Sequence, residues 1–238
     1  MVNYSDEALR KVRQDRLLLD ALDRWLYEEV ASYLGPRVLE IGCGHGNFAW
    51  QLKDRELYIG TDVCEDSVET VRRIGRGRAN VRAFVADATA VSFRELSAFR
   101  VQTVFSLNVF EHIDDHVAAF RNTREILEPG GHLVLVVPAH QWLYGSMDES
   151  IGHYRRYSKA SMLSLFAETG FTGVRLKYMN ALGALGWYVN GRLRKMRTPP
   201  TGQLKAFNRL VPLLQRCERV VPAPFGVSLL AVGARRER

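Results

Sequence analysis

The amino-acid sequence predicts an α/β fold, a doubly wound, mostly parallel seven-stranded sheet with helices on both faces. Short apolar segments alternate with longer segments of helical periodicity between residues 37 and 178. This alternation is typical of βαβ units with right-handed crossovers. The stretch from Leu133 to Val137 is apolar throughout, as expected for a strand that helices cover on both faces. A strand also runs through three glycines into a helix between residues 37 and 53, as in the first turn of such a sheet.

The individual elements follow from hydrophobic periodicity and from the residues that end each segment. An N-terminal helical region, residues 6–34, places Leu18, Leu22, Trp25 and Leu26 on one apolar face. The predicted strands are residues 37–41, 57–62, 81–86, 101–107, 132–137, 171–178 and 228–234. The predicted helices between them are residues 48–53, 65–74, 114–127 and 158–169. A Pro-Gly-Gly sequence is expected to stop the third of these helices, and two or three further helices are expected between residues 180 and 225.

We expect one main domain with additions, because 238 residues can bury one substantial core. The predicted parts are an N-terminal helical cap (1–36), a sheet core (37–179), a helical insertion (180–226) and a final strand with a basic tail (227–238). The polar N-terminus argues against a secretory signal, and no apolar run reaches about 18 residues. Cys43, Cys64 and Cys217 fit neither a disulfide nor a metal spacing. The expected location is therefore the cytoplasm.

The net charge of +7 is unevenly distributed along the chain. Lysine and arginine far outnumber acids from Ala181 to the C-terminus, whereas the rest of the chain is close to balanced. A basic end on a neutral body suggests an anionic surface or substrate, although solvated helix faces explain the same arginines equally well. A nucleic-acid-binding protein is disfavoured, because the basic residues are not interleaved with aromatic residues in a recognisable motif.

The most specific motif is the turn after the first predicted strand. It reads E-x-G-x-G-x-G and comprises Glu40, Gly42, Cys43, Gly44 and Gly46. Each missing Cβ lets a ligand lie against the main chain, and the following helix start offers free N–H groups. Dinucleotide sites prefer the spacing G-x-G-x-x-G, but Asn47 stands in the place of the third glycine. Because Glu40 is also well placed for a cation, the motif disfavours an NAD-dependent oxidoreductase.

Polar residues follow the next predicted strands at the edge where doubly wound sheets bind ligands. Asp62 lies at the distance from Gly42 at which an acid accepts from ribose hydroxyls. Asp87 can accept from an adenine amino group while the N–H of Ala88 meets a ring nitrogen. Helix capping is the structural alternative for both acids. The predicted contacts after these strands are Asp62, Val63, Asp87, Ala88, Asn108 and His112.

Together these residues resemble class I S-adenosylmethionine-dependent methyltransferases. The resemblance covers about residues 37–178 and the last strand, through the glycine motif, Asp62, the V-A-D-A sequence around Asp87 and an L-E-P-G-G turn. It implies a Rossmann-like core with S-adenosylmethionine as cofactor. The glycine loop would hold the methionine part, Asp62 the ribose and Asp87 the adenine. The long insertion before the last strand departs from the family pattern and leaves the acceptor side open.

The resemblance implies methyl transfer, and a hydroxyl or protonated amine acceptor needs a base. We expect that base in the loop after the fifth strand, which overhangs the methyl side of the cofactor in this family. His153 is the first candidate because histidine titrates near neutral pH, with Asp148 as the residue that orients it. His140 and His112 are alternative candidates. For each of these histidines, the non-catalytic alternative is a structural role in a hydrogen bond.

The same loop supplies the predicted acceptor contacts. Trp142, Tyr144 and Tyr157 are expected to wall a site for a flat or apolar acceptor. Arg155 and Arg156 are expected to hold a carboxylate or phosphate, unless they pair with nearby acids instead. The predicted partner is thus a small-molecule acceptor, anionic or aromatic, that is methylated on oxygen or nitrogen.

The sequence also indicates whether a metal is bound and what the insertion does. No metal is expected, because the histidines and cysteines show no ligand spacing. An apolar stripe is expected at Leu182, Leu185, Tyr188 or Val189, and Leu193, and basic residues follow it. A lid over the substrate, a homodimer surface and a helix on an anionic membrane all stay open. The leading alternative to a small metabolite is therefore a lipid or lipid-linked acceptor that is met at a membrane surface.

Overall fold

The computed structural model describes residues 18–237, and the chain divides into two compact units. The insertion unit comprises the described residues up to Glu29, together with Val137–Lys159 and Lys177–Leu230. The sheet unit comprises Val30–Val136, Ala160–Leu176 and the described residues from Ala231 onward. The predicted four-part division of the chain stays a prediction.

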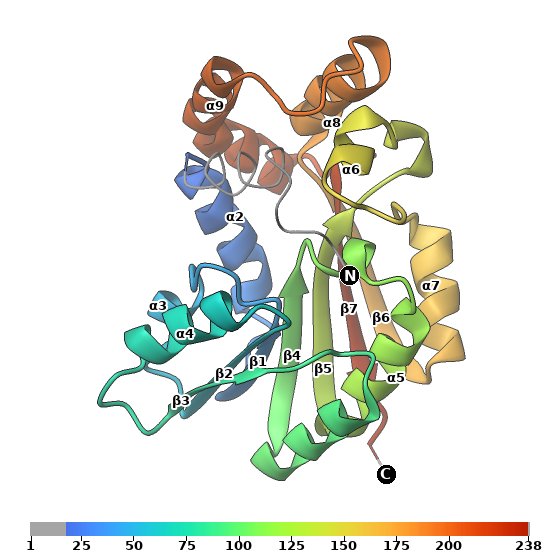
Figure 1. Ribbon diagram of the computed structural model, residues 1–238. Helices are drawn as coiled ribbons and strands as arrows, with labels where there is room; N and C mark the ends of the chain where they lie inside the picture. Colours follow the sequence, from blue (N-terminus) through green and yellow to red (C-terminus); the bar gives the residue numbers. More distant parts are fainter. Residues whose placement is uncertain (1–17, 238) are drawn as a thin grey trace. The chain divides into compact units, whose positions relative to one another are not determined.

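A seven-stranded sheet has the strand order β3-β2-β1-β4-β5-β7-β6, with β7 antiparallel to the other strands (Figure 1). The strands are β1 (Arg37–Ile41), β2 (Leu57–Asp62), β3 (Val81–Val85), β4 (Val101–Leu107), β5 (Leu127–Pro138), β6 (Phe171–Met179) and β7 (Ser228–Arg235). The predicted doubly wound fold class is confirmed. The strand order reverses between β1 and β4, which pair in parallel. Ligands of such sheets bind beside this reversal, at the carboxyl ends of the strands.

Helices cover the sheet because each buries one apolar stripe. The helical segments of this part are α3 (Ala49–Leu52), α4 (Glu65–Ile74), η1 (Val91–Phe99), η2 (Phe110–His112), α5 (His116–Ile126) and α7 (Lys159–Glu168). Val68 and Val71 of α4 are fully buried. Phe120 of α5 lies edge-on to Phe110 and Phe166, with ring centroids 5.1 and 5.3 Å apart. These contacts position the loops that follow β2 and β4.

The strand β5 begins earlier than predicted. The sequence suggested a helix to residue 127, a turn at Pro129-Gly130-Gly131 and a strand from His132, but α5 ends at Ile126 and β5 starts at Leu127. The register against β4 shifts within this stretch, and Gly130 has a φ of +77°. The Pro-Gly-Gly sequence therefore forms an irregularity inside a strand, because pairing with β4 resumes on both sides of it.

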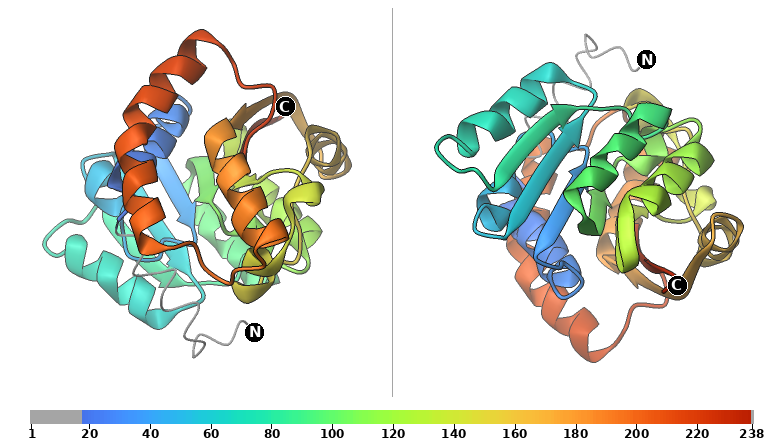
Figure 2. Two further views of the ribbon diagram at one scale, coloured as in Figure 1. Left: turned by 90° about the horizontal axis from the view of Figure 1, so that it is seen from above. Right: turned by 90° about the horizontal axis from the view of Figure 1, so that it is seen from below.

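The insertion unit is mainly helical. Its helical segments are α2 (Asp20–Ala31, whose last two residues belong to the sheet unit), η3 (Gln141–Leu143), α6 (Ser146–Ser150), α8 (Ala181–Trp187), the π-helix η4 (Tyr188–Leu193) and α9 (Thr201–Val220). The predicted helical insertion before the last strand is confirmed, whereas the predicted N-terminal helix before residue 18 lies outside the described residues. Asn208 of α9 donates to Asp20 and accepts from the N–H of Ala21, so α2 runs beside α9 (Figure 2). None of the helices in the described part of the chain is long and apolar enough to cross a membrane.

Candidate functional site

The turn after β1 contains the three glycines of the motif. Gly42, Gly44 and Gly46 have φ angles of +79°, +49° and +73°, which other residues rarely adopt. A Cβ on Gly42 would lie 2.3 Å from a methyl group of Val109. A Cβ on Gly46 would lie 2.6 Å from Cδ1 of Ile74. Within residues 18–237, a Cβ on Gly44 would meet only the carbonyl oxygen of Gly42, at 4.0 Å. Packing thus explains the outer two glycines, whereas the space beside Gly44 is open to a ligand.

Asp62, at the end of β2, holds this turn in place. Its Oδ2 accepts from the backbone N–H of Gly44 at 3.0 Å, and its Oδ1 accepts from the N–H of Cys64 at 2.9 Å. Each carboxylate oxygen has two lone pairs, and the side chain is only half-buried. Asp62 can therefore fix the glycine turn and still accept from a ligand hydroxyl.

Glu40 is a buried acid behind the same turn. The hydroxyl of Tyr58 donates to its Oε2 at 2.5 Å. Burial, with a smaller contribution from the charge of Asp62, raises the pKa of Glu40 to about 8 against the opposing hydrogen bond. Burial also raises the pKa of the neighbouring Cys43 thiol, which therefore stays protonated. A cationic ligand group close to Glu40 would favour its ionised form.

The turn after β3 presents Asp87 to solvent. Its Oδ1 accepts from the backbone N–H and the hydroxyl of Thr89, both at 2.8 Å. The next residue, Ala88, is buried, and its carbonyl accepts from Nδ2 of Asn122 at 2.9 Å. The same Asn122 nitrogen donates to the carbonyl of Ala90 at 3.0 Å. Asn122 thus shapes the turn, and the sequence reasoning missed it because α5 is distant in the chain.

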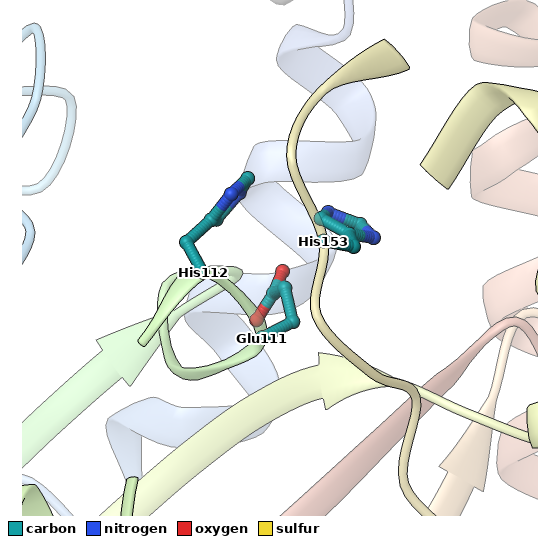
Figure 3. A group of neighbouring side chains, drawn as sticks. All are labelled: Glu111, His112 and His153. Atoms are coloured by element: carbon teal, nitrogen blue, oxygen red, sulfur yellow. The ribbon is translucent and has the colours of Figure 1, made fainter. Parts of the chain in front are cut away.

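The segment after β4 begins at Asn108, which has a φ of +56° and donates its N–H to the carbonyl of Val136 at 2.8 Å. Two residues of the η2 turn that follows carry titratable side chains, Glu111 and His112 (Figure 3). Glu111 is fully buried, whereas His112 is half-buried. Glu111 was not predicted as a site residue, although it directly precedes the predicted His112.

In the insertion unit, Asp148 of α6 is fully buried and accepts four hydrogen bonds. Its Oδ1 lies 2.8 Å from Nδ1 of His153 and 2.8 Å from Nε of Arg156. Its Oδ2 accepts from the N–H of Gly145 at 3.1 Å and from the indole of Trp187 at 3.0 Å. Burial acts to raise the pKa of Asp148, but the hydrogen bond from His153 and the charge of Arg156 outweigh it and lower that pKa.

The two adjacent arginines of this loop differ in their surroundings. The side chain of Arg156 is buried, its Nη1 donates to the carbonyl of Ala139 at 3.0 Å, and its guanidinium lies 4.8 Å from the ring centroid of Trp187. Arg155 is half-buried, with its guanidinium 5.7 Å from the ring centroid of Tyr154. The structural ion pair that the sequence left open therefore describes Arg156, and the predicted acceptor contact of Arg155 stays a prediction.

His140 and several aromatic side chains lie together. His140 has a φ of +63°, and its ring centroid is 4.4 Å from that of Tyr178 and 5.5 Å from that of Trp142. The exposed Trp142 ring is 6.0 Å from that of Tyr188 in η4. Burial, with the charge of Arg156, lowers the pKa of His140. The predicted Trp142 thus joins two tyrosines, Tyr178 and Tyr188, that the sequence did not indicate as acceptor contacts.

The two predicted tyrosines are less open. The hydroxyl of Tyr144 donates to the carbonyl of His153 at 2.7 Å, and burial raises the pKa of that hydroxyl. Tyr157 is buried, and its backbone forms hydrogen bonds with Pro138 and His140. Both tyrosines therefore support the loop that carries His153, and their predicted contacts with an acceptor stay predictions.

Comparison with known proteins identifies the family. Residues 9–176, more than half of the chain, match the family described as "Methyltransferase domain". The chain belongs to this family. The methyltransferase is 26% identical over 110 residues to the ubiquinone biosynthesis O-methyltransferase of Aliivibrio fischeri, a match that covers 46% of this chain and 47% of that protein. It is 22% identical over 181 residues to the protein of the same name from Vibrio campbellii, covering 68% of this chain and 77% of that one. The chain thus spans about half the length of the first curated relative.

The methyltransferase also resembles solved structures. A crystal structure from Thermotoga maritima, described as a "SAM-dependent methyltransferase, possible histamine N-methyltransferase", aligns with a TM-score of 0.66 at 16% identity. The alignment covers 99% of this chain and 100% of that one. At this identity the likeness shows the fold.

The family uses S-adenosylmethionine, and the sheet unit of the methyltransferase fits that cofactor. All predicted cofactor residues lie at or just after the carboxyl ends of β1 to β4. The open space beside Gly44 is where a side chain would block a ligand. The contacts of individual residues with the cofactor stay predictions. The predicted residues His140, Asp148, His153, Arg155 and Arg156 all belong to the insertion unit.

Proposed function

We propose that this methyltransferase transfers a methyl group to an oxygen or nitrogen atom of a small-molecule acceptor, with His153 as the base that removes the acceptor proton. The observation that carries the proposal is the buried 2.8 Å contact between Nδ1 of His153 and Oδ1 of Asp148. Asp148 is the positioning residue. A histidine held by a buried carboxylate is the usual arrangement of a general base.

The charge of Asp148 decides the tautomer of His153. Because the pKa of Asp148 is lowered, the group is an ionised carboxylate that only accepts hydrogen bonds. Nδ1 of His153 therefore carries the proton in this contact, and Nε2 is the basic nitrogen of the neutral ring. Arg156 and Trp187 donate to the same carboxylate and hold it still. The ring is thus oriented before an acceptor binds.

Methyl transfer requires orientation more than charge stabilisation. Bound S-adenosylmethionine supplies an electrophilic methyl group on a sulfonium. The protein orients the acceptor, excludes water and removes one proton from its hydroxyl or ammonium group. Nε2 of His153 receives that proton in the proposed reaction. The side chain of His153 is 6% exposed, so little water competes with the acceptor for Nε2.

Aromatic residues of the insertion unit favour a flat acceptor. Trp142, Tyr178 and Tyr188 present aromatic surface within the same unit. Arg155 offers a cation for an acidic substituent, because its side chain is half-buried whereas that of Arg156 is fully buried. The curated relatives are named O-methyltransferases, which supports oxygen over nitrogen.

The test is methyl transfer from radiolabelled S-adenosylmethionine to catechol, 4-hydroxybenzoate and histamine as probe acceptors. With any probe that is methylated, His153→Ala should lower kcat by about 10²–10⁴ and leave cofactor affinity unchanged. Asp148→Asn should also lower kcat, because an amide can present an N–H to Nδ1 and favour the wrong tautomer. His132→Ala is the matched control, since His132 lies in β5 and is assigned no role. A loss of less than tenfold in His153→Ala would overturn the assignment and leave His140 or an unassisted reaction.

A lipid or lipid-linked acceptor is the second candidate. The observation in its favour is the exposed apolar surface of α8 and η4, which includes Leu185 and Leu193. Incubation of the enzyme with labelled cofactor and a bacterial lipid extract, followed by organic extraction, tests it. Label that enters the organic phase only with active enzyme supports a lipid acceptor. Label transferred only to the small probes excludes it.

A further inference from the structure

Helix α9 has an inner face that the insertion unit already uses. Val211 and Glu218 of that face are buried. Gln215 and Arg219 both donate to Glu28 of α2 at 2.7 Å. Glu218 accepts from the N–H groups of Asn180 and Ala181 at 3.0 and 2.9 Å. These contacts fix the rotation of α9 about its axis and so determine which residues face outward.

The outward side of α9 carries a second apolar stripe. It comprises Ala206, Leu210, Leu213, Cys217 and Val220, spaced four, three, four and three residues apart. That spacing places them on one side of a helix. The exposed fractions of Leu210, Leu213 and Val220 are 46%, 59% and 82%. A continuous apolar row at these exposures is more than isolated surface leucines and indicates a binding surface.

A basic row runs beside this stripe. Lys205, Arg209 and Arg216 each precede a stripe residue by one position and are exposed, so they lie about 100° around the helix from it. Glu218, the single acid of α9, is buried under the inner face. The outward side of α9 is therefore apolar and positively charged, with no exposed acid.

The segment before α9 repeats this combination. Leu185, Val189 and Leu193 of α8 and η4 are exposed, and Arg194 and Lys195 follow directly and are exposed too. Nδ2 of Asn190 in η4 donates to Gln203 at the start of α9 at 2.9 Å. The two helices lie at the same end of the insertion unit (Figure 1 and Figure 2).

We infer that α9, together with the α8–η4 segment, is a docking surface for an anionic lipid bilayer. Apolar side chains flanked by lysine and arginine are what a helix needs to lie in the headgroup region of anionic membranes. A second copy of the chain fits less well, because pairing α9 with α9 would bring two basic rows together without an acid to offset them. The inference concerns membrane association and holds whether the acceptor is a lipid or a small metabolite.

The experiment is co-sedimentation of the full chain with vesicles. Vesicles of equal parts phosphatidylglycerol and phosphatidylcholine should bind the protein, and vesicles of phosphatidylcholine alone should bind it much less. The triple variant Lys205→Gln, Arg209→Gln, Arg216→Gln should weaken binding about 100-fold, at about fivefold per basic residue. Leu210→Ser with Leu213→Ser should weaken it by at least about tenfold on both kinds of vesicle. Raising the salt concentration should weaken binding of the wild type more than binding of the triple variant, which keeps Arg194 and Lys195.

Matched controls come from the sheet unit. Leu163→Ser on α7 and Arg76→Gln after α4 change exposed residues of the same kinds and should leave vesicle binding unchanged. Affinity for S-adenosylhomocysteine should be the same in all variants, which shows that each one is folded. Equal binding to both kinds of vesicle, or none, would overturn the inference. A dimer by light scattering that the Leu210→Ser, Leu213→Ser variant dissociates would overturn it as well, because a second copy would then cover the stripe.

Discussion

The glycines after β1 show at the residue scale how packing and ligand binding are separated. Gly42 and Gly46 are crowded by Val109 and Ile74, so a side chain at either position strains the fold itself. Gly44 is different, because its positive φ is what opposes a side chain there, and no described residue crowds the position. The backbone N–H of Gly44 also donates a hydrogen bond to Asp62. Of the three glycines, Gly44 is therefore the one whose substitution tests cofactor binding with the least disturbance of packing.

We expect Gly44→Val to abolish S-adenosylmethionine binding while lowering the unfolding free energy by only about 1–2 kcal/mol, the cost of a left-handed residue that bears a Cβ. Gly42→Ala should destabilise the fold more, because its Cβ would lie 2.3 Å from Val109. Calorimetric titration and denaturant unfolding on both variants make the comparison. The reading of this turn is wrong if Gly44→Val binds the cofactor normally.

The buried Glu40 predicts a pH dependence at the same scale. Its pKa in the folded protein is raised from 4.5 to about 8. Between these values the folded chain binds more protons than the unfolded chain, so the group makes stability fall as pH rises through this window. Glu40→Gln should remove this pH dependence, which changes the unfolding free energy of the wild type by a few kcal/mol at most. Thermal unfolding of the wild type and the variant from pH 5 to 8 measures it, and parallel curves would contradict the shift.

At the scale of elements, the loop that carries His153 is fastened to the insertion helices. Trp187 of α8 donates to Asp148, and the hydroxyl of Ser146 lies 2.9 and 2.7 Å from the carbonyl oxygens of Gly191 and Met196, within donating distance of either. The insertion is therefore part of the support of the proposed base. A change in α8 would reach His153 through Asp148.

The two arginines of this loop should respond differently to substitution. Arg156→Ala should lower the unfolding free energy by about 3–5 kcal/mol, because Asp148 would keep a buried charge without its arginine. Arg155→Lys should change stability by less than about 0.5 kcal/mol, yet raise KM about tenfold for an anionic acceptor. Chemical denaturation and kinetics with 4-hydroxybenzoate test the pair. Equal destabilisation by both changes would refute the assignment.

At the scale of the whole molecule, the cofactor contacts are expected in the sheet unit and the base in the insertion unit. S-adenosylhomocysteine at about 100 times its dissociation constant should stabilise the protein by about 2.7 kcal/mol. Asp62→Ala should weaken cofactor binding by about 1.5–3 kcal/mol, partly because Gly44 loses its acceptor. Thermal shift assays with and without ligand measure both effects. An undiminished shift in Asp62→Ala would remove Asp62 from the site.

The sequence alone was sufficient for features set by local pattern. The bounds of β1, β2, β4 and α4 agree with those predicted from the sequence, because apolar runs, helical periodicity and the residues that end each segment are local features. The glycine motif likewise marked the turn after β1, where the structure gives all three glycines positive φ angles. The family follows from the same stretch, since its glycines, acid and strand ends all lie close together in the chain.

Only the tertiary structure decided the features that depend on distant partners. The early start of β5 follows from pairing with β4, and no local signal marks it. Asp148 gathers donors from Gly145, His153, Arg156 and Trp187, and the last of these is far along the chain. The choice between Arg155 and Arg156 was equally out of reach, because adjacent residues point in different directions. Which of them is buried depends on the elements that pack against the loop, and sequence spacing does not contain that information.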